Sequence, residues 1–238
     1  MAENTVHYVY AFRLGDGSQR VLDIVLDAQT MAIAQPARKT YPSWTALECD
    51  QCPNCPLSTS EHPRCPIAVA LVDLVDFFKD APSYGAVDVQ LETAERSYSK
   101  NTTAQRALAS ILGIYMVASG CPIMDKLRPM VRFHLPFSNA SETTYRVISI
   151  YLMAQYFRKR KGIETDWDLR GLIALYQDIH QINTHFLERL KQIETQDTSA
   201  NALIILDCYA NQVQLSIDDS SLGEFESLFA PYLTDGEI

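Results

Sequence analysis

The chain has 238 residues, of which 47% are apolar and 21% are charged, and it carries a net charge of -9 with a pI of about 5.0. This composition is that of a globular protein that can bury a core of its own, so a bound metal is not expected to be its only source of stability. Nucleic acid is not an expected partner, because binding to phosphates needs clustered lysine and arginine.

The first third of the chain predicts a meander of antiparallel strands. Apolar residues alternate with other residues over 6–14, which is the period of a strand, and the Asp-Gly pair at 16–17 is a hairpin signal. Alternation over 22–26 predicts the return strand. Further strands are expected at residues 30–34 and 87–92.

Helical periodicity dominates the rest of the sequence. Residues 67–79 place their apolar side chains on one face of a helix. From residue 101 onward the pattern predicts a bundle, several of whose helices open with capping residues. The expected starts are Thr102, Asn139, Asp166, Ser199 and Ser221. The basic run at 158–161 falls at a predicted helix end, where cations are favourable, so it is not interpreted as a phosphate-binding patch.

Together these elements predict an α+β fold, in which a small antiparallel sheet of about four strands and a cysteine-rich metal loop pack against a C-terminal helical bundle. We expect an N-terminal α+β part at residues 1–100, with the metal loop at 49–65, and a helical part at residues 101–238. No flexible linker separates the two parts, so they are expected to share one core.

The sequence favours a cytoplasmic location without a membrane partner. The N-terminus lacks the basic and apolar regions of a signal peptide, and no apolar stretch reaches the roughly 20 residues of a membrane span. A homodimer is a further expectation, because the predicted helices are rich in aromatic residues.

The strongest functional signal is a cluster of four cysteines within residues 49–65. They are Cys49, Cys52, Cys55 and Cys65, with the spacing C-x2-C-x2-C-x9-C. Two residues between cysteines let a tight turn direct both sulfurs at one ion, and prolines after the last three cysteines stiffen these turns. Clustered cysteines in a cytosolic chain indicate a metal centre in preference to structural disulfides.

Zinc is the expected metal, since tetrahedral Zn2+ binds four such ligands. A [4Fe-4S] cluster is the alternative, because C-x2-C-x2-C with trailing proline resembles the ferredoxin run, although the fourth spacing here is longer. Three cysteines with His62 are another possible zinc set. The remaining cysteines, Cys121 and Cys208, are expected to be buried apolar thiols, with a reactive thiol at Cys121 as the alternative.

A second unusual segment, from Gly120 to Phe137, combines three prolines with basic side chains. Arg128, Arg132 and His134 are candidates to converge on an anion, and His134 is a candidate acid or base. The alternative interpretation is a packed connection whose charges cap helix ends and pair with neighbouring carboxylates such as Asp125 and Glu142.

Two stretches together resemble one family. They are Cys52-Pro53-Asn54-Cys55-Pro56-Leu57 with Cys65-Pro66, and the run from Gly120 to Phe137 that continues to residues 151–157. Over most of its length the chain resembles a family of uncharacterised bacterial proteins of about this size. The resemblance implies a bacterial, cytosolic source, and it lends neither an activity nor a catalytic residue.

Three hypotheses for function follow. The first is a binding or regulatory module that zinc stabilises and that takes a protein partner or a small ligand. The second is a [4Fe-4S] redox or sensor protein. The third is an enzyme that uses the segment at 121–137, which requires Arg128, Arg132 and His134 to line one pocket. The sequence names no substrate for any of them.

Overall fold

The computed structural model describes residues 4–15, 17–36, 38–78, 83–193, 197–218 and 222–234. The chain forms two compact units. Unit 1 comprises Met1–Phe137 and Gln181–Asp207, and unit 2 comprises Ser138–His180 and Cys208–Ile238. Two long helices, α5 (Arg170–Lys191) and α6 (Thr198–Asp218), therefore contribute residues to both units.

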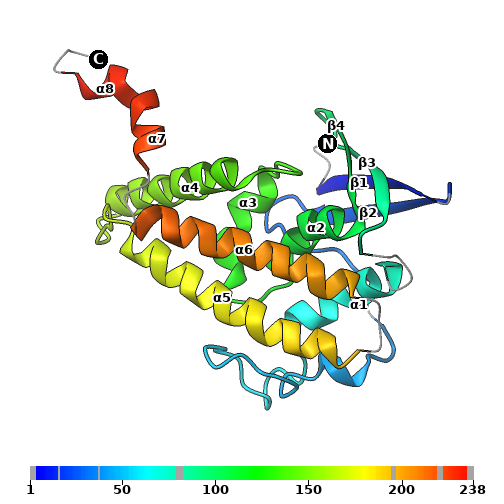
Figure 1. Cartoon of the computed structure of the whole chain (residues 1–238). Helices are drawn as coiled ribbons and strands as arrows, with labels where there is room; N and C mark the ends of the chain where they lie inside the picture. The colour runs from blue at the N-terminus through cyan, green and yellow to red at the C-terminus, as the bar shows by residue number, and fades with distance from the viewer. Residues whose placement is uncertain are drawn as a thin grey trace. The chain divides into compact units, whose positions relative to one another are not determined.

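Unit 1 contains, within the described residues, a four-stranded antiparallel sheet with the order β2-β1-β3-β4 (Figure 1). The strands are β1 (Thr5–Leu14), β2 (Gln19–Asp27), β3 (Ala86–Glu92) and β4 (Ser97–Thr103). The predicted alternation of β1 is confirmed, because Tyr8, Tyr10 and Phe12 are buried on one face while Arg13 is exposed on the other. The α+β class is therefore confirmed.

The sheet differs from the prediction in two strands. Residues 30–34 do not form a strand, and only one antiparallel bridge joins Leu26 to Ile33. The fourth strand is instead β4, an edge strand defined by its pairing with β3. The search for alternating apolar residues missed it, because this polar strand buries little surface. Thr102 lies in β4 opposite Val87, so the predicted cap at Thr102 is wrong.

Two helices pack on the buried face of the sheet and against each other. They are α1 (Pro66–Phe78) and α2 (Ala104–Ala118). Phe78 of α1 meets Phe12 of β1 edge to face, with ring centroids 5.4 Å apart. After α2, the chain forms the short helices η2 (Met124–Leu127) and α3 (Arg128–Arg132), which pack against α2. The end of α2 and the start of η2 therefore belong to the same compact unit as the cysteine loop.

Unit 2 is helical over its described residues. Besides its parts of α5 and α6, it contains α4 (Ala140–Arg160), α7 (Gly223–Glu226), η3 (Ser227–Phe229) and α8 (Ala230–Leu233). The basic residues of 158–160 occupy the last turn of α4, as predicted. The expected start at Ser221 lies outside the described residues. Asp166 lies four positions before α5, where its Oδ2 accepts a hydrogen bond of 2.7 Å from the Gly171 N–H.

The capping box predicted at Asn139 is present. Its side-chain oxygen accepts a hydrogen bond of 2.8 Å from the Glu142 N–H, and the Glu142 carboxylate accepts one of 2.8 Å from the Asn139 N–H. We expect Asn139→Ala to destabilise unit 2 by about 1 kcal/mol, because a backbone donor loses its partner. Urea unfolding measures the change. Glu142→Gln is the control, since it retains an acceptor for the cap and should cost less; equal losses would contradict the assignment.

Among the helices within the described ranges, none combines the length and the apolar character that crossing a bilayer requires.

Candidate metal centre

The cysteine loop lies between the short helix η1 (Ser43–Thr45) and the start of α1. Backbone hydrogen bonds close it: the Leu47 N–H donates to the Pro63 carbonyl at 3.0 Å, and the Cys65 N–H donates to the Thr45 carbonyl at 2.9 Å. An isolated antiparallel bridge between Ala46 and Arg64 lies between these two bonds. The two ends of the loop are thus held side by side, although the intervening residues form no regular element.

Two local turns position the central cysteines. The Cys55 N–H donates to the Cys52 carbonyl at 3.0 Å, which closes a turn with Pro53 at its second position, a place that proline favours. Cys65 directly precedes α1, and its carbonyl accepts the Val69 N–H at 3.0 Å. The backbone N–H groups of Ile67 and Ala68 also stabilise the Cys65 thiolate. A proline at the first position of a helix supports this geometry, because its missing N–H would have no partner there.

Burial controls the ionisation of these thiols. Burial raises the pKa of Cys52 to about 12, and the thiols of Cys65, Cys55 and Cys121 raise it further, in that order. Burial likewise raises the pKa of Cys65. Both thiols are therefore protonated at neutral pH in the absence of a cation. A bound metal would reverse this preference, because its charge stabilises thiolates directly.

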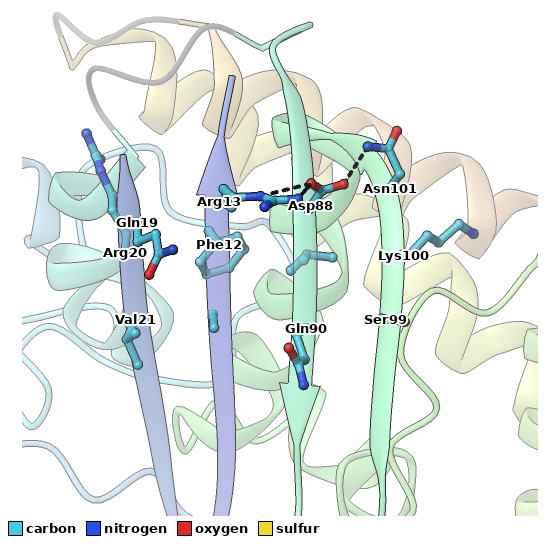
Figure 2. Close-up of a pocket in the computed structure, with 12 residues that line it drawn as sticks. Phe12, Arg13, Gln19, Arg20, Val21, Asp88, Gln90, Ser99, Lys100 and Asn101 are labelled. Carbon is cyan, nitrogen blue, oxygen red and sulfur yellow. Dashed lines mark hydrogen bonds and ion pairs between the residues drawn. The ribbon is translucent and has the colours of Figure 1, made fainter. Parts of the chain in front are cut away.

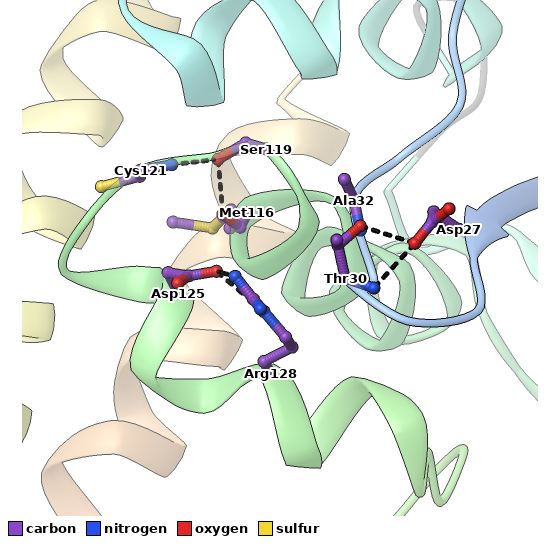
Figure 3. Close-up of polar contacts among 8 residues, drawn as sticks. All are labelled: Asp27, Thr30, Ala32, Met116, Ser119, Cys121, Asp125 and Arg128. Atoms are coloured by element: carbon purple, nitrogen blue, oxygen red, sulfur yellow. Dashed lines mark hydrogen bonds and ion pairs between the residues drawn. The ribbon is translucent and has the colours of Figure 1, made fainter.

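Cys121 joins this group from a distant part of the sequence. It is buried, with 9% of its surface exposed, and its N–H donates to Ser119 Oγ at 3.2 Å (Figure 3). Burial raises the pKa of Cys121, and the thiols of Cys65 and Cys55 add to this shift, whereas the N–H groups of Met124 and Ile123 lower it. The prediction of a buried thiol at this position is confirmed. The structure also places Cys121 within electrostatic range of the loop cysteines, which the sequence analysis did not foresee.

The remaining candidates have other surroundings. Cys49 Sγ donates a hydrogen bond of 3.5 Å to Gln192 Oε1. His62 is exposed, and its backbone N–H bonds to the Ser58 carbonyl at 2.8 Å. Cys208 is exposed, so the prediction that it is buried is wrong. Leu206 and Tyr209 flank it closely in α6, but its own position faces solvent.

The cysteines suit a metal ion by the chemistry of their sulfur donors and not by their present arrangement. Within the part of the chain that the structure describes, no three His, Cys, Asp or Glu side chains are arranged so as to hold an ion as they stand. Cys52, Cys55, Cys65 and Cys121 nevertheless form a set of soft donors, three of them with a pKa raised chiefly by burial. Thiolates of this kind suit Zn2+ and iron–sulfur clusters.

Comparison with known families gives one match. A family model described as Domain of unknown function (DUF6901) matches residues 6–230. The chain belongs to this family. No curated protein and no solved structure matches the chain. Membership in DUF6901 agrees with the predicted resemblance to an uncharacterised family, and it supplies no activity.

A buried arginine holds the start of the cysteine loop. Arg189 of α5 is 2% exposed, and its Nη1 donates to the carbonyls of Trp44 and Ala46, both at 2.7 Å. Its Nη2 lies 3.4 Å from the Leu47 carbonyl. The same guanidinium lowers the pKa of Cys52 and Cys65 against the larger effect of burial.

Sequence reasoning missed Arg189, although a signal was present. Ile179, Ile182 and Phe186 are buried at helical spacing along α5, and Arg189 occupies the next position of that series. A charged side chain at a buried position of a helix needs hydrogen-bond partners inside the protein, since an unpaired buried charge is costly. Carbonyl groups of the loop are those partners.

The basic segment at 120–137 places its three candidates against different partners. Arg128 pairs with Asp125, whose Oδ1 lies 3.0 Å from Arg128 Nε (Figure 3). Arg132 is exposed, and its carbonyl accepts a hydrogen bond of 3.3 Å from the Tyr8 hydroxyl. His134 Nε2 lies 2.8 Å from the hydroxyl of Tyr10. The pairing of Arg128 with Asp125 is the contact that a packed connection would make.

The hydrogen bond between Tyr10 and His134 gives a testable prediction. Tyr10 is fully buried, and burial raises the pKa of its hydroxyl. We expect Tyr10→Phe to lower the free energy of unfolding by about 1–2 kcal/mol, because it leaves a partly buried ring nitrogen without this partner. Chemical denaturation measures the loss. Tyr84, which is 76% exposed, provides the control, and a loss as large in Tyr84→Phe would contradict the argument.

A hollow of about 570 Å³ lies on the sheet of unit 1 (Figure 2). Two of its charged side chains form an ion pair, in which Arg13 Nη2 lies 2.6 Å from Asp88 Oδ2, and Asn101 Nδ2 lies 2.6 Å from Asp88 Oδ1. The hydrogen bonds from Asn101 and Arg13 lower the pKa of Asp88. Because the ion pair is exposed, it contributes little to stability. The hollow is therefore explained as a solvated sheet face.

Proposed function

We propose that this chain holds one thiolate-bound metal centre on the cysteine loop of residues 49–65 and acts as a metal-dependent binding or regulatory protein in a reducing, cytoplasmic setting. The observation that carries the proposal is the grouping of Cys52, Cys55 and Cys65 in one partly buried site. Neighbouring buried thiols add little packing that other small apolar residues would not provide. Their chemical advantage is that together they bind a soft cation.

Zinc is the leading metal in this proposal. Four thiolates around Zn2+ carry a net charge of about −2. The fixed charge of Arg189, which acts on Cys52 and Cys65, would offset part of that charge. A [4Fe-4S] cluster is the alternative, since it takes four cysteines as well and its potential responds to nearby charge. When bound, zinc would supply a structural crosslink and the iron–sulfur cluster would supply electron transfer.

The test is elemental analysis with an absorption spectrum on protein purified anaerobically from cells supplied with both metals. One zinc per chain without a visible band would support the structural centre. Iron with sulfide and a broad band near ~400 nm would support the cluster. Protein that is free of metal after this preparation, and that binds neither Zn2+ nor a reconstituted cluster, would overturn the proposal.

A further inference from the structure

The cysteines of the chain divide into two sets by the residue that follows them. Cys52, Cys55, Cys65 and Cys121 are each followed by proline. Cys49 is followed by aspartate and Cys208 by tyrosine. The four cysteines that precede a proline are therefore not the four that cluster in the sequence. Cys121 takes the place of Cys49.

Proline gives Cys65 and Cys121 the same local geometry. The carbonyl of each cysteine accepts a hydrogen bond from the N–H four residues later: Val69 for Cys65 at 3.0 Å, and Asp125 for Cys121 at 2.9 Å. The proline that follows each cysteine has no N–H. The first backbone N–H groups that can donate to the sulfur are therefore those of the residues two and three positions after the cysteine. These N–H groups act on each sulfur and favour its thiolate. Each sulfur thus has backbone N–H donors within reach, while burial raises the pKa of both thiols overall.

The tertiary structure of unit 1 brings the two cysteines together. Helix α1 begins directly after Cys65, α2 ends three residues before Cys121, and the two helices pack against each other. The Ile33 N–H donates to the Ala118 carbonyl at 3.0 Å, and Gln35 Nε2 donates to the Ala70 carbonyl of α1 at 2.9 Å. Residues 33–35 thus tie the end of α2 to α1. The thiol of Cys121 accordingly interacts with those of Cys52, Cys55 and Cys65.

Cys49 is held elsewhere on the loop. Its Sγ bonds to Gln192, and Gln192 also donates to the carboxylate of Asp50. Asp50, which lies between Cys49 and the turn at Cys52, adopts a backbone φ of 43°, in the left-handed region. The hydrogen bond of its thiol thus directs Cys49 toward Gln192, which directly follows α5.

We infer that Cys121, and not Cys49, is the fourth ligand, so that the metal set is Cys52, Cys55, Cys65 and Cys121. The inference rests on the proposed metal centre and refines it. A centre of this kind would crosslink the cysteine loop to the segment at 120–137, which carries Arg128 and His134. Loading of the metal would then change the stability of that segment, which is the arrangement a metal-responsive regulatory protein needs.

The experiment compares serine variants of the full chain, purified anaerobically, by metal content and by Co2+ titration as a spectroscopic probe of thiolate coordination. Cys49→Ser and Cys208→Ser are expected to bind metal like the wild type. Cys121→Ser is expected to lose at least about tenfold in affinity, since even indirect changes around a metal cost roughly that much. Circular dichroism of each variant reports whether it folds.

Two further variants separate coordination from packing. Cys121→Ala removes the sulfur but keeps a small apolar residue, so it should lose metal as Cys121→Ser does. Cys121→His is expected to retain zinc and to change the Co2+ spectrum, because histidine replaces cysteine in Cys3His sites. A spectral change of this kind is not produced by a residue that only packs.

The outcomes distinguish this inference from the proposed function. Wild-type protein without metal would end both. Metal in the wild type, together with its loss in Cys49→Ser or its full retention in Cys121→Ala, would overturn the inference and leave the metal centre standing. Retention in Cys49→Ser with loss in both Cys121→Ser and Cys121→Ala would support the inference.

Discussion

Replacing Arg189 with methionine is expected to lower the free energy of unfolding by about 3–5 kcal/mol. Methionine fills similar volume but donates no hydrogen bond, so the carbonyls of Trp44 and Ala46 lose their donor within a buried site. Each buried acceptor left without a partner costs roughly 1–3 kcal/mol. The loss is large compared with a total stability of about 5–15 kcal/mol. Denaturant unfolding at constant pH measures it.

Lys191 provides a matched control on the same helix. Its ammonium pairs with Glu188 at 2.7 Å, and its side chain is 56% exposed. An exposed pair of this kind contributes about 0–1 kcal/mol, so Lys191→Met should unfold close to the wild type. A loss in Arg189→Met no greater than that in Lys191→Met would show that the guanidinium does not hold the loop. The metal affinity of Arg189→Met should also fall, because the loop would no longer be anchored.

Removing the metal is expected to produce the second large effect. A ligand that binds only the folded state stabilises it by about 4 kcal/mol when its free concentration is 1,000 times its dissociation constant. A strong chelator should therefore lower the melting temperature of the wild type. Cys55→Ser should melt like the chelated wild type whether or not metal is present. Differential scanning calorimetry, with and without the chelator, makes the comparison.

Cys208→Ser is the control for this experiment, since Cys208 is exposed and lies in unit 2. It should keep both the metal and the response to the chelator. A wild-type melting curve that does not move after chelation would contradict a metal centre that stabilises the fold. The comparison of Cys55→Ser with Cys208→Ser also excludes a general effect of removing one thiol.

Much of the fold could be predicted from local patterns. The alternation over 6–14 predicted β1, the helical face of 67–79 predicted α1, and the capping box at Asn139 predicted α4, since each depends on residues a few positions apart. Thr102 shows the limit of this reasoning. Its sequence context resembles a capping box, but pairing with Val87 places it in β4. Backbone hydrogen bonds between strands require no apolar pattern of side chains, so a polar edge strand cannot be recognised from its sequence.

The sequence by itself determined the α+β class, the position of the cysteine loop and the turns that its prolines stiffen, because these are local properties of backbone and side-chain chemistry. Only the tertiary structure decided that Arg189 supports the loop and that Cys121 lies within electrostatic range of Cys52 and Cys65. Both residues are far from the loop in sequence, and they reach it through the packing of helices. Packing of this kind depends on buried surfaces of the whole chain, which no short segment specifies.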